Sequence, residues 1–166
     1  DGNQTEILEP GPTLSTEIEE DFENHFLRLL DEDINVVTLS GSLPKGISTD
    51  YYVKLISHAN RTETPVVLDT SGHALHAVLS SKIARPTLIK PNLSELEQLL
   101  GEVVTTDVDE LKSALTNSLF NDIQTIVVTL GKDGAFVKHQ EDFYTCSIPV
   151  VKAVNPVGSG DATVAG

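Results

Sequence analysis

The chain has 166 residues, 39% of them hydrophobic and 22% charged, which is enough for one globular domain with its own core. Its 25 acidic side chains outnumber the 11 basic ones, which gives a formal net charge of -14. Such a surface repels nucleic acid and anionic membranes, so we expect neither as a partner. The single cysteine, Cys146, excludes an internal disulfide and suits a cytoplasmic location, and we expect it to be a packing thiol within a strand.

The first part of the chain alternates helical and strand-like patterns. A capping-box pattern at Thr16–Glu19 begins a helix whose apolar residues recur at helical spacing. The run 35–40 predicts a strand, and 41–46 the loop that leaves it. Ser48 is expected to cap a second helix, and a short buried strand follows at 65–69.

The alternation continues and then changes to a hairpin. The next predicted elements are a helix over 72–82, a strand over 87–90, a helix from Asn92 to Gly101, a helix from Asp107 through Leu119, and a strand over 125–130. Residues 135–139 and 143–148 predict two hairpin strands around Glu141 and Asp142. The order indicates one α/β domain over 1–166, with a mostly parallel sheet, helices on both faces and a late antiparallel hairpin.

The last residues read as an anion-binding loop that runs into a helix. Gly158, Ser159 and Gly160 let the backbone N–H groups approach an anion at a helix N-terminus, and Asp161 follows at once. A carboxylate there would repel a phosphate, unless it takes a proton from a hydroxyl that attacks phosphorus. This pattern indicates a phosphoryl transferase, although glycine and aspartate at a helix start are also ordinary capping.

Other chemically suggestive residues follow successive predicted strands. They are Ser42 after the first strand, Asp69 after the second, Lys90 and Asn92 after the third, and Gly131 after the fourth. Ligands bind outside the carboxyl ends of strands in an open parallel sheet, so we expect these residues to share one edge.

Four motifs in this order resemble the PfkB group of ribokinase-like sugar kinases over the whole chain. They are Gly41-Ser42-Leu43-Pro44-Lys45-Gly46, Lys90-Pro91-Asn92-Leu93-Ser94-Glu95, Val128-Thr129-Leu130-Gly131-Lys132-Asp133-Gly134 and Asn155 to Asp161. The last departs from the family's usual Asp-Thr-x-Gly-Ala-Gly-Asp, because Asn155-Pro156 replaces Asp-Thr and Ser159 replaces Ala. This variant of the motif is most similar to that of the branch that includes tagatose-6-phosphate kinases and 1-phosphofructokinases.

The resemblance implies a ribokinase-like three-layer sandwich and an ATP-dependent, Mg²⁺-dependent kinase. It implies transfer to a phosphosugar, first of all tagatose 6-phosphate, with 1-phosphofructokinase or 6-phosphofructokinase activity as the alternative. The family's chain is longer at both ends, so this chain is expected to lack the N-terminal part with the lid and the C-terminal helices. A homodimer through parts absent from this chain is compatible with the resemblance, and a non-catalytic nucleotide- or sugar-phosphate-binding module is the rival reading.

The resemblance also assigns roles to residues of the second and last motifs. Asp161 matches the catalytic base, and the backbone N–H groups of Gly158, Ser159 and Gly160 match the anion hole. Lys90 matches a lysine that reaches the nucleotide phosphates, unless it is a surface lysine at the edge of the sheet. Asn92 and Glu95 match the motif that positions Mg²⁺ and its waters, and their spacing is equally that of a capping box.

Two further assignments concern the nucleotide and the acceptor. Thr129, Gly131 and Gly134 match the ATP-binding loop, or else form an ordinary turn from a strand into a hairpin. Ser42 matches a position near the sugar's phosphate. Lys45 could assist Ser42, although a solvated turn lysine explains it equally well.

Overall fold

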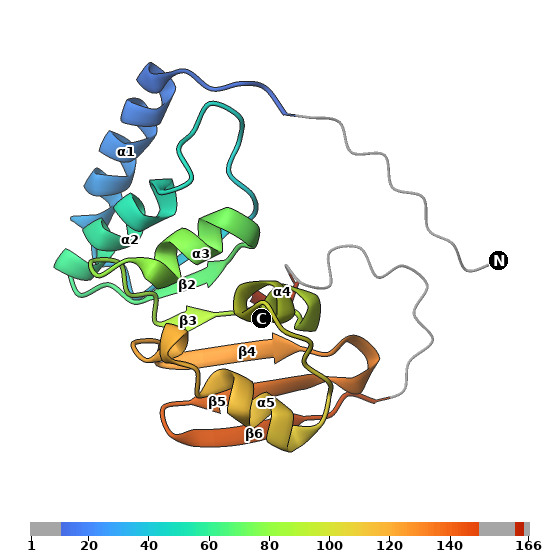
Figure 1. The fold of residues 1–166 in the computed structure, drawn as a ribbon. Coiled ribbons are helices and arrows are strands. Elements are labelled where there is room, and N and C mark those ends of the chain that lie inside the picture. Colours follow the sequence, from blue (N-terminus) through green and yellow to red (C-terminus); the bar gives the residue numbers. More distant parts are fainter. Residues whose placement is uncertain (1–10, 150–161, 165–166) are drawn as a thin grey trace.

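The computed structural model describes residues 11–149 and 162–164. Within them, six strands form one sheet in chain order, β1-β2-β3-β4-β5-β6 (Figure 1). Strands β1 to β4 pair in parallel, whereas β4, β5 and β6 pair antiparallel. The strands are β1 Val37–Ser40, β2 Val66–Asp69, β3 Leu88–Ile89, β4 Thr125–Thr129, β5 Ala135–His139 and β6 Asp142–Cys146. The predicted α/β class, with a mostly parallel sheet and a late hairpin, is confirmed.

The α-helices of residues 11–149 precede or connect the parallel strands. They are α1 Thr16–Leu30, α2 Tyr51–Arg61, α3 Gly72–Ser80, α4 Leu93–Leu100 and α5 Val108–Leu115, with 3-10 turns at Ser118–Phe120 and Gly131–Asp133. Parallel crossovers are right-handed, and here each moves the chain one strand in the same direction. The crossover helices therefore cover one face, as α2, α3 and α5 do in Figure 1, whereas the sequence predicted helices on both faces.

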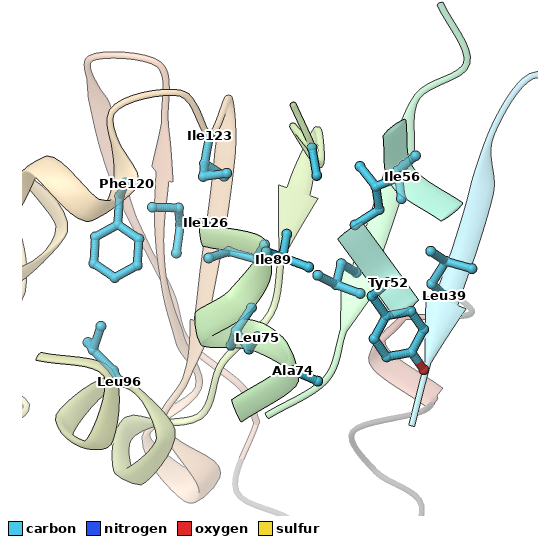
Figure 2. Packing of buried hydrophobic residues seen from close by; sticks show 14 of the residues in the cluster. Leu39, Tyr52, Ile56, Ala74, Leu75, Ile89, Leu96, Phe120, Ile123 and Ile126 are labelled. Carbon is cyan, nitrogen blue, oxygen red and sulfur yellow. The ribbon is translucent and has the colours of Figure 1, made fainter. Parts of the chain in front are cut away.

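The burial of alternate strand residues agrees with this layering. On the helix-covered face, Val66, Leu68 and Val128 are fully buried, whereas Val67 and Val127 on the opposite face are only half-buried. The core joins helices and sheet, and Figure 2 shows Leu75, Ile89 and Ile126 among its packed side chains. The largest fully buried side chains include Leu55, Ile56, Leu68, Leu75, Ile89, Leu96, Leu111, Leu115, Phe120, Ile126 and Phe136.

Two predicted helix starts are wrong in detail. The N-cap of α1 is Ser15 rather than Thr16, because the Ser15 hydroxyl accepts a hydrogen bond from the N–H of Ile18 at 3.5 Å. Helix α2 begins after Asp50, and Ser48 offers its backbone carbonyl to the N–H of Tyr51 instead of a capping side chain. Adjacent hydroxyl and carboxylate residues are similarly good caps, so local sequence does not choose between them.

Three later expectations also need correction. Helix α5 ends at Leu115 rather than Leu119, because Asn117 caps a separate 3-10 turn through its side-chain oxygen. The hairpin turns at Gln140 and Glu141, with Gln140 at a positive φ of 54°, so β6 begins earlier than predicted. Cys146 is exposed at the end of this edge strand and is not a packing thiol.

An ion-pair cluster joins α1 to α2. Glu23 accepts hydrogen bonds from His58 at 2.7 Å and from Lys54, and its side chain is 15% exposed. Burial by itself raises the pKa of Glu23, but the hydrogen bonds and charges of Lys54 and His58 outweigh it and lower the pKa. The same contact, mainly its hydrogen bond, raises the pKa of Lys54. The cluster thus fixes α1 on α2 at neutral pH.

Among the described helices, none is both long and apolar enough to cross a membrane.

Candidate functional site

The carboxyl ends of the four parallel strands are aligned at one edge of the sheet. Ser40 at the end of β1 is in register with Asp69 at the end of β2, and the N–H of Gly41 donates to the Asp69 carbonyl at 2.9 Å. Past the end of β3, Asn92 forms a parallel bridge with Thr129 at the end of β4. The loops that carry the predicted residues Ser42, Lys90, Asn92 and Gly131 therefore leave the sheet at the same edge.

Lys90 is a buried lysine with a partner. It is 7% exposed, and its Nζ lies 3.2 Å from Oδ1 of Asp69, whose side chain is 16% exposed. A buried ammonium group is costly unless an anion lies nearby, and Asp69 provides that anion. The surface-lysine reading is excluded by this burial. The pair thus places an ammonium group, compensated by a carboxylate, at the carboxyl ends of β2 and β3.

The loop after β1 is held by side chains from two other elements. The Gly41 carbonyl accepts hydrogen bonds from the hydroxyls of Thr70, at 2.8 Å, and Tyr52, at 3.0 Å. Burial, followed by the charge of Asp69, raises the pKa of Tyr52, so its hydroxyl stays protonated as a donor. Ser42 follows the clamped glycine and is exposed. Lys45 is an exposed turn residue in the same loop.

Asn92 and Glu95 form the capping box that their spacing predicts. Asn92 Oδ1 accepts from the N–H of Glu95 at 2.9 Å, and Glu95 Oε2 accepts from the N–H of Asn92 at 2.9 Å. Within the described residues, Oε1 of Glu95 accepts no hydrogen bond. A carboxylate has acceptor sites to spare, so the cap leaves an oxygen available for a metal-bound water.

The donor set at this edge fits Mg²⁺. The described residues contain no group of three or more His, Cys, Asp or Glu that could enclose a metal. Magnesium takes oxygen ligands, keeps several waters and needs only one or two carboxylates besides substrate phosphates. Glu95, with Asn92 beside it, meets that requirement.

The segment after β4 is a turn that requires two glycines. Gly131 and Gly134 have positive φ angles of 60° and 89°. A Cβ on Gly134 would lie 1.9 Å from the carbonyl oxygen of Cys146. The N–H of Leu130 donates to the Gly134 carbonyl at 2.8 Å, which closes the turn into β5. Thr129, Gly131 and Gly134 therefore form an ordinary turn from a strand into a hairpin, and most backbone N–H groups of this turn donate within it.

Part of the predicted set lies outside the described residues, and part of the observed set is new. Gly158, Ser159, Gly160 and Asp161 lie outside the described residues. Sequence reasoning placed Asp69 at this edge without giving it a role in the site, and it missed Tyr52 and Thr70. Asp69 had a signal, since it ends a predicted strand, but Tyr52 reads only as an apolar position of a helix.

Comparison with known proteins places this geometry in context. Residues 1–166 match the pfkB family carbohydrate kinases. A tagatose-6-phosphate kinase of Staphylococcus epidermidis (strain RP62A) is 51% identical over all 166 residues, which cover 100% of this chain and 53% of that protein. The chain thus spans about half the length of the curated relatives it matches.

Solved structures share the fold. Phosphofructokinase-2 of Escherichia coli in complex with potassium superposes with a TM-score of 0.83 at 31% identity, over 98% of this chain and 52% of that one. The same enzyme in complex with fructose-6-phosphate gives a TM-score of 0.79 at 28% identity, over 97% and 52% of the two chains.

Proposed function

Because the chain belongs to the pfkB family of carbohydrate kinases, we propose that the intact protein transfers the γ-phosphoryl group of ATP to a phosphosugar. The preferred acceptor is tagatose 6-phosphate, which gives tagatose 1,6-bisphosphate and ADP, in keeping with the 51% identity to tagatose-6-phosphate kinases. The observation that carries the proposal is the convergence of the loops bearing Ser42, Lys90, Asn92 and Gly131 on one edge of the sheet.

Asp161 is the proposed catalytic base. It orients an acceptor hydroxyl and takes its proton as the oxygen attacks the γ-phosphorus in line with the leaving ADP oxygen. The backbone N–H groups of Gly158, Ser159 and Gly160 stabilise the charge on the transferred group, as preorganised donors do in a water-excluded site. These four roles rest on the match between the chain's last motif and the family.

Lys90 and the capping box serve the nucleotide. Lys90 provides the buried cation for the ATP phosphates, and Asp69 compensates its charge when no nucleotide is bound. Glu95, with Asn92, would hold water-bound Mg²⁺, which would neutralise negative charge on the ATP phosphates. Thr129, Gly131 and Gly134 shape the turn along which ATP lies. In this proposal Lys90 and the Mg²⁺ held by Glu95 thus provide the positive charge that faces the ATP phosphates.

Ser42 contacts the phosphate that the acceptor already carries. A fructose phosphate is the second candidate acceptor, since solved phosphofructokinase-2 structures share the fold at 28–31% identity. A non-catalytic binding module would need the same phosphate contacts but not Asp161. We also propose that the enzyme is cytoplasmic and forms a homodimer through parts outside this chain. Oligomers occur among its relatives, since phosphofructokinase-2 of Escherichia coli has a tetrameric inhibited form.

The test is ADP release by the intact protein with Mg-ATP and one acceptor at a time. The acceptors are tagatose 6-phosphate, fructose 6-phosphate, fructose 1-phosphate and ribose. A kcat/KM at least tenfold higher for tagatose 6-phosphate supports the proposal. A preference for a fructose phosphate reassigns the acceptor, and turnover of none of the four contradicts the kinase proposal.

A further inference from the structure

The carbonyl of Gly41 is clamped by two buried hydroxyls. Tyr52 Oη donates to it at 3.0 Å and Thr70 Oγ1 at 2.8 Å, and these two side chains are 7% and 6% exposed. The donors come from separate elements, the first turn of α2 and the residue that follows β2. Figure 2 shows the Tyr52 hydroxyl beside the strand that bears Leu39, which is β1. Two elements of the core thus converge on one carbonyl of an exposed loop.

The clamp fixes a whole peptide plane. The Gly41–Ser42 peptide is planar and trans, as are the peptide bonds throughout the described residues. In a trans peptide the N–H of Ser42 points opposite to the carbonyl of Gly41. On the other side of Gly41, its own N–H continues the sheet ladder to Asp69 at 2.9 Å. The direction of the Ser42 N–H is therefore set by Tyr52, Thr70 and the ladder together.

The Ser42 N–H has no hydrogen-bond partner within the described residues. Gly41 has a φ of 99°, which turns the chain sharply as it leaves β1. Within residues 11–149 and 162–164, the Ser42 N–H donates no hydrogen bond, and Ser42 is exposed. A fixed backbone N–H beside a serine hydroxyl is a donor pair suited to a phosphate oxygen.

We infer that Tyr52 and Thr70 are positioning residues for the acceptor's phosphate, because they orient the Ser42 N–H as a second donor beside the Ser42 hydroxyl. The inference rests on the proposed function, which places Ser42 at that phosphate. Neither hydroxyl touches the substrate; both act through the Gly41 carbonyl. If the loop were free to turn, the donor pair would have to be ordered at each binding event, which weakens binding.

The test compares hydroxyl deletions that keep side-chain shape. Tyr52→Phe and Thr70→Val each remove one clamp bond, and Thr70→Ser keeps the hydroxyl. Tyr51→Phe is the matched control, because the adjacent Tyr51 is as buried and donates to a backbone carbonyl of helix α1, that of Glu19 at 3.1 Å, rather than to the carbonyl of Gly41. The intact protein is assayed with Mg-ATP and tagatose 6-phosphate, and the KM of each is measured separately.

Each deletion should raise the KM for tagatose 6-phosphate about threefold to tenfold, the effect of one hydrogen bond. The KM for ATP should stay within twofold of the wild-type value. The KM for tagatose 6-phosphate should be higher in the double variant than in either single variant, and in Thr70→Ser it should stay near the wild-type value. Tyr51→Phe should lower the melting temperature as much as Tyr52→Phe does, with no change in either KM. An unchanged sugar KM in the deletions, or an equal rise in Tyr51→Phe, overturns the inference.

A second readout separates this inference from the proposed function. The ¹H–¹⁵N resonance of the Ser42 amide is followed as tagatose 6-phosphate, and in a parallel titration inorganic phosphate, is added. A saturable shift in the wild type that weakens in the double variant supports the clamp even if the wild type transfers no phosphoryl group. If the Ser42 amide responds to neither ligand, the inference fails, whatever the turnover.

Discussion

Replacing Lys90 with methionine should both destabilise the protein and weaken ATP binding. The Lys90 Nζ and Asp69 Oδ1 lie 3.2 Å apart, and the two side chains are 8% and 16% exposed. At an effective dielectric constant of about 20, their Coulomb attraction is about 5 kcal/mol. Desolvation of both charges offsets most of this energy, so the intact pair adds little net stability. Lys90→Met leaves the Asp69 carboxylate buried and unpaired, which should cost about 3 kcal/mol.

A double-mutant cycle tests that magnitude. Lys90→Met/Asp69→Asn removes both charges, so its free energy of unfolding should return to within about 1 kcal/mol of wild type. The free energies are measured by urea unfolding of the intact protein at pH 7. Lys82→Met, at an exposed lysine, is the control and should change stability by less than about 0.5 kcal/mol.

ATP affinity separates the structural role of the pair from its proposed nucleotide role. Loss of one charge-assisted hydrogen bond, worth about 1.5–3 kcal/mol, should weaken ATP binding about tenfold to a hundredfold in Lys90→Met. The double variant should recover stability but not ATP affinity. The reasoning is refuted if the single and double variants are equally stable, or if the double variant binds ATP as the wild type does.

Three further changes test other parts of the structure. Gly134→Ala places a Cβ 1.9 Å from the Cys146 carbonyl oxygen of β6 at a φ of 89°, and should lower the free energy of unfolding in urea by about 2–3 kcal/mol. Gly101→Ala, at a φ of 70° in open space, should lower it by about 1 kcal/mol. Equal losses in the two variants would contradict the steric argument. Glu23 has a lowered pKa in the folded state, so its stabilisation is present above the usual pKa of 4.5 and is lost as the pH falls through the folded value. Glu23→Gln should therefore lower the free energy of unfolding by about 1 kcal/mol at pH 7 and by much less at pH 3, and a pH-independent difference would argue against the pair. Glu95→Gln keeps an oxygen for the capping box, so the free energy of unfolding should change by less than about 0.5 kcal/mol. The Mg²⁺ concentration for half-maximal activity should rise several-fold, because the carboxylate is lost. A large loss of stability with unchanged Mg²⁺ dependence would show that Glu95 serves only as a cap.

Most of the fold follows from short-range sequence patterns. The alternation of apolar runs predicts the parallel strands and the crossover helices, and the spacing of Asn92 and Glu95 predicts their reciprocal cap. Exact boundaries do not follow, because neighbours such as Ser15 and Thr16 compete for one capping position. Burial separates such candidates only once the helix is docked on the core.

Site residues that lie within one short segment could be predicted from the sequence. Contacts between residues that are distant in the chain could not. The sequence shows a lysine at the end of a strand, but its pairing with Asp69 depends on β2 and β3 lying side by side. Tyr52 and Thr70 read as a core aromatic and a strand-end threonine, respectively. Their common acceptor, Gly41, is 11 and 29 residues away in the chain, so no local pattern reveals it.

The most direct test of the central claim is the kcat of Asp161→Asn beside the wild type. Both intact proteins are given saturating Mg-ATP and tagatose 6-phosphate, and ATP affinity is measured in parallel. Because the carboxylate is proposed to act on the acceptor's proton during transfer, kcat should fall about a hundredfold to ten-thousandfold, with ATP affinity within a few-fold of wild type. A variant that turns over as fast as the wild type would contradict phosphoryl transfer by this base.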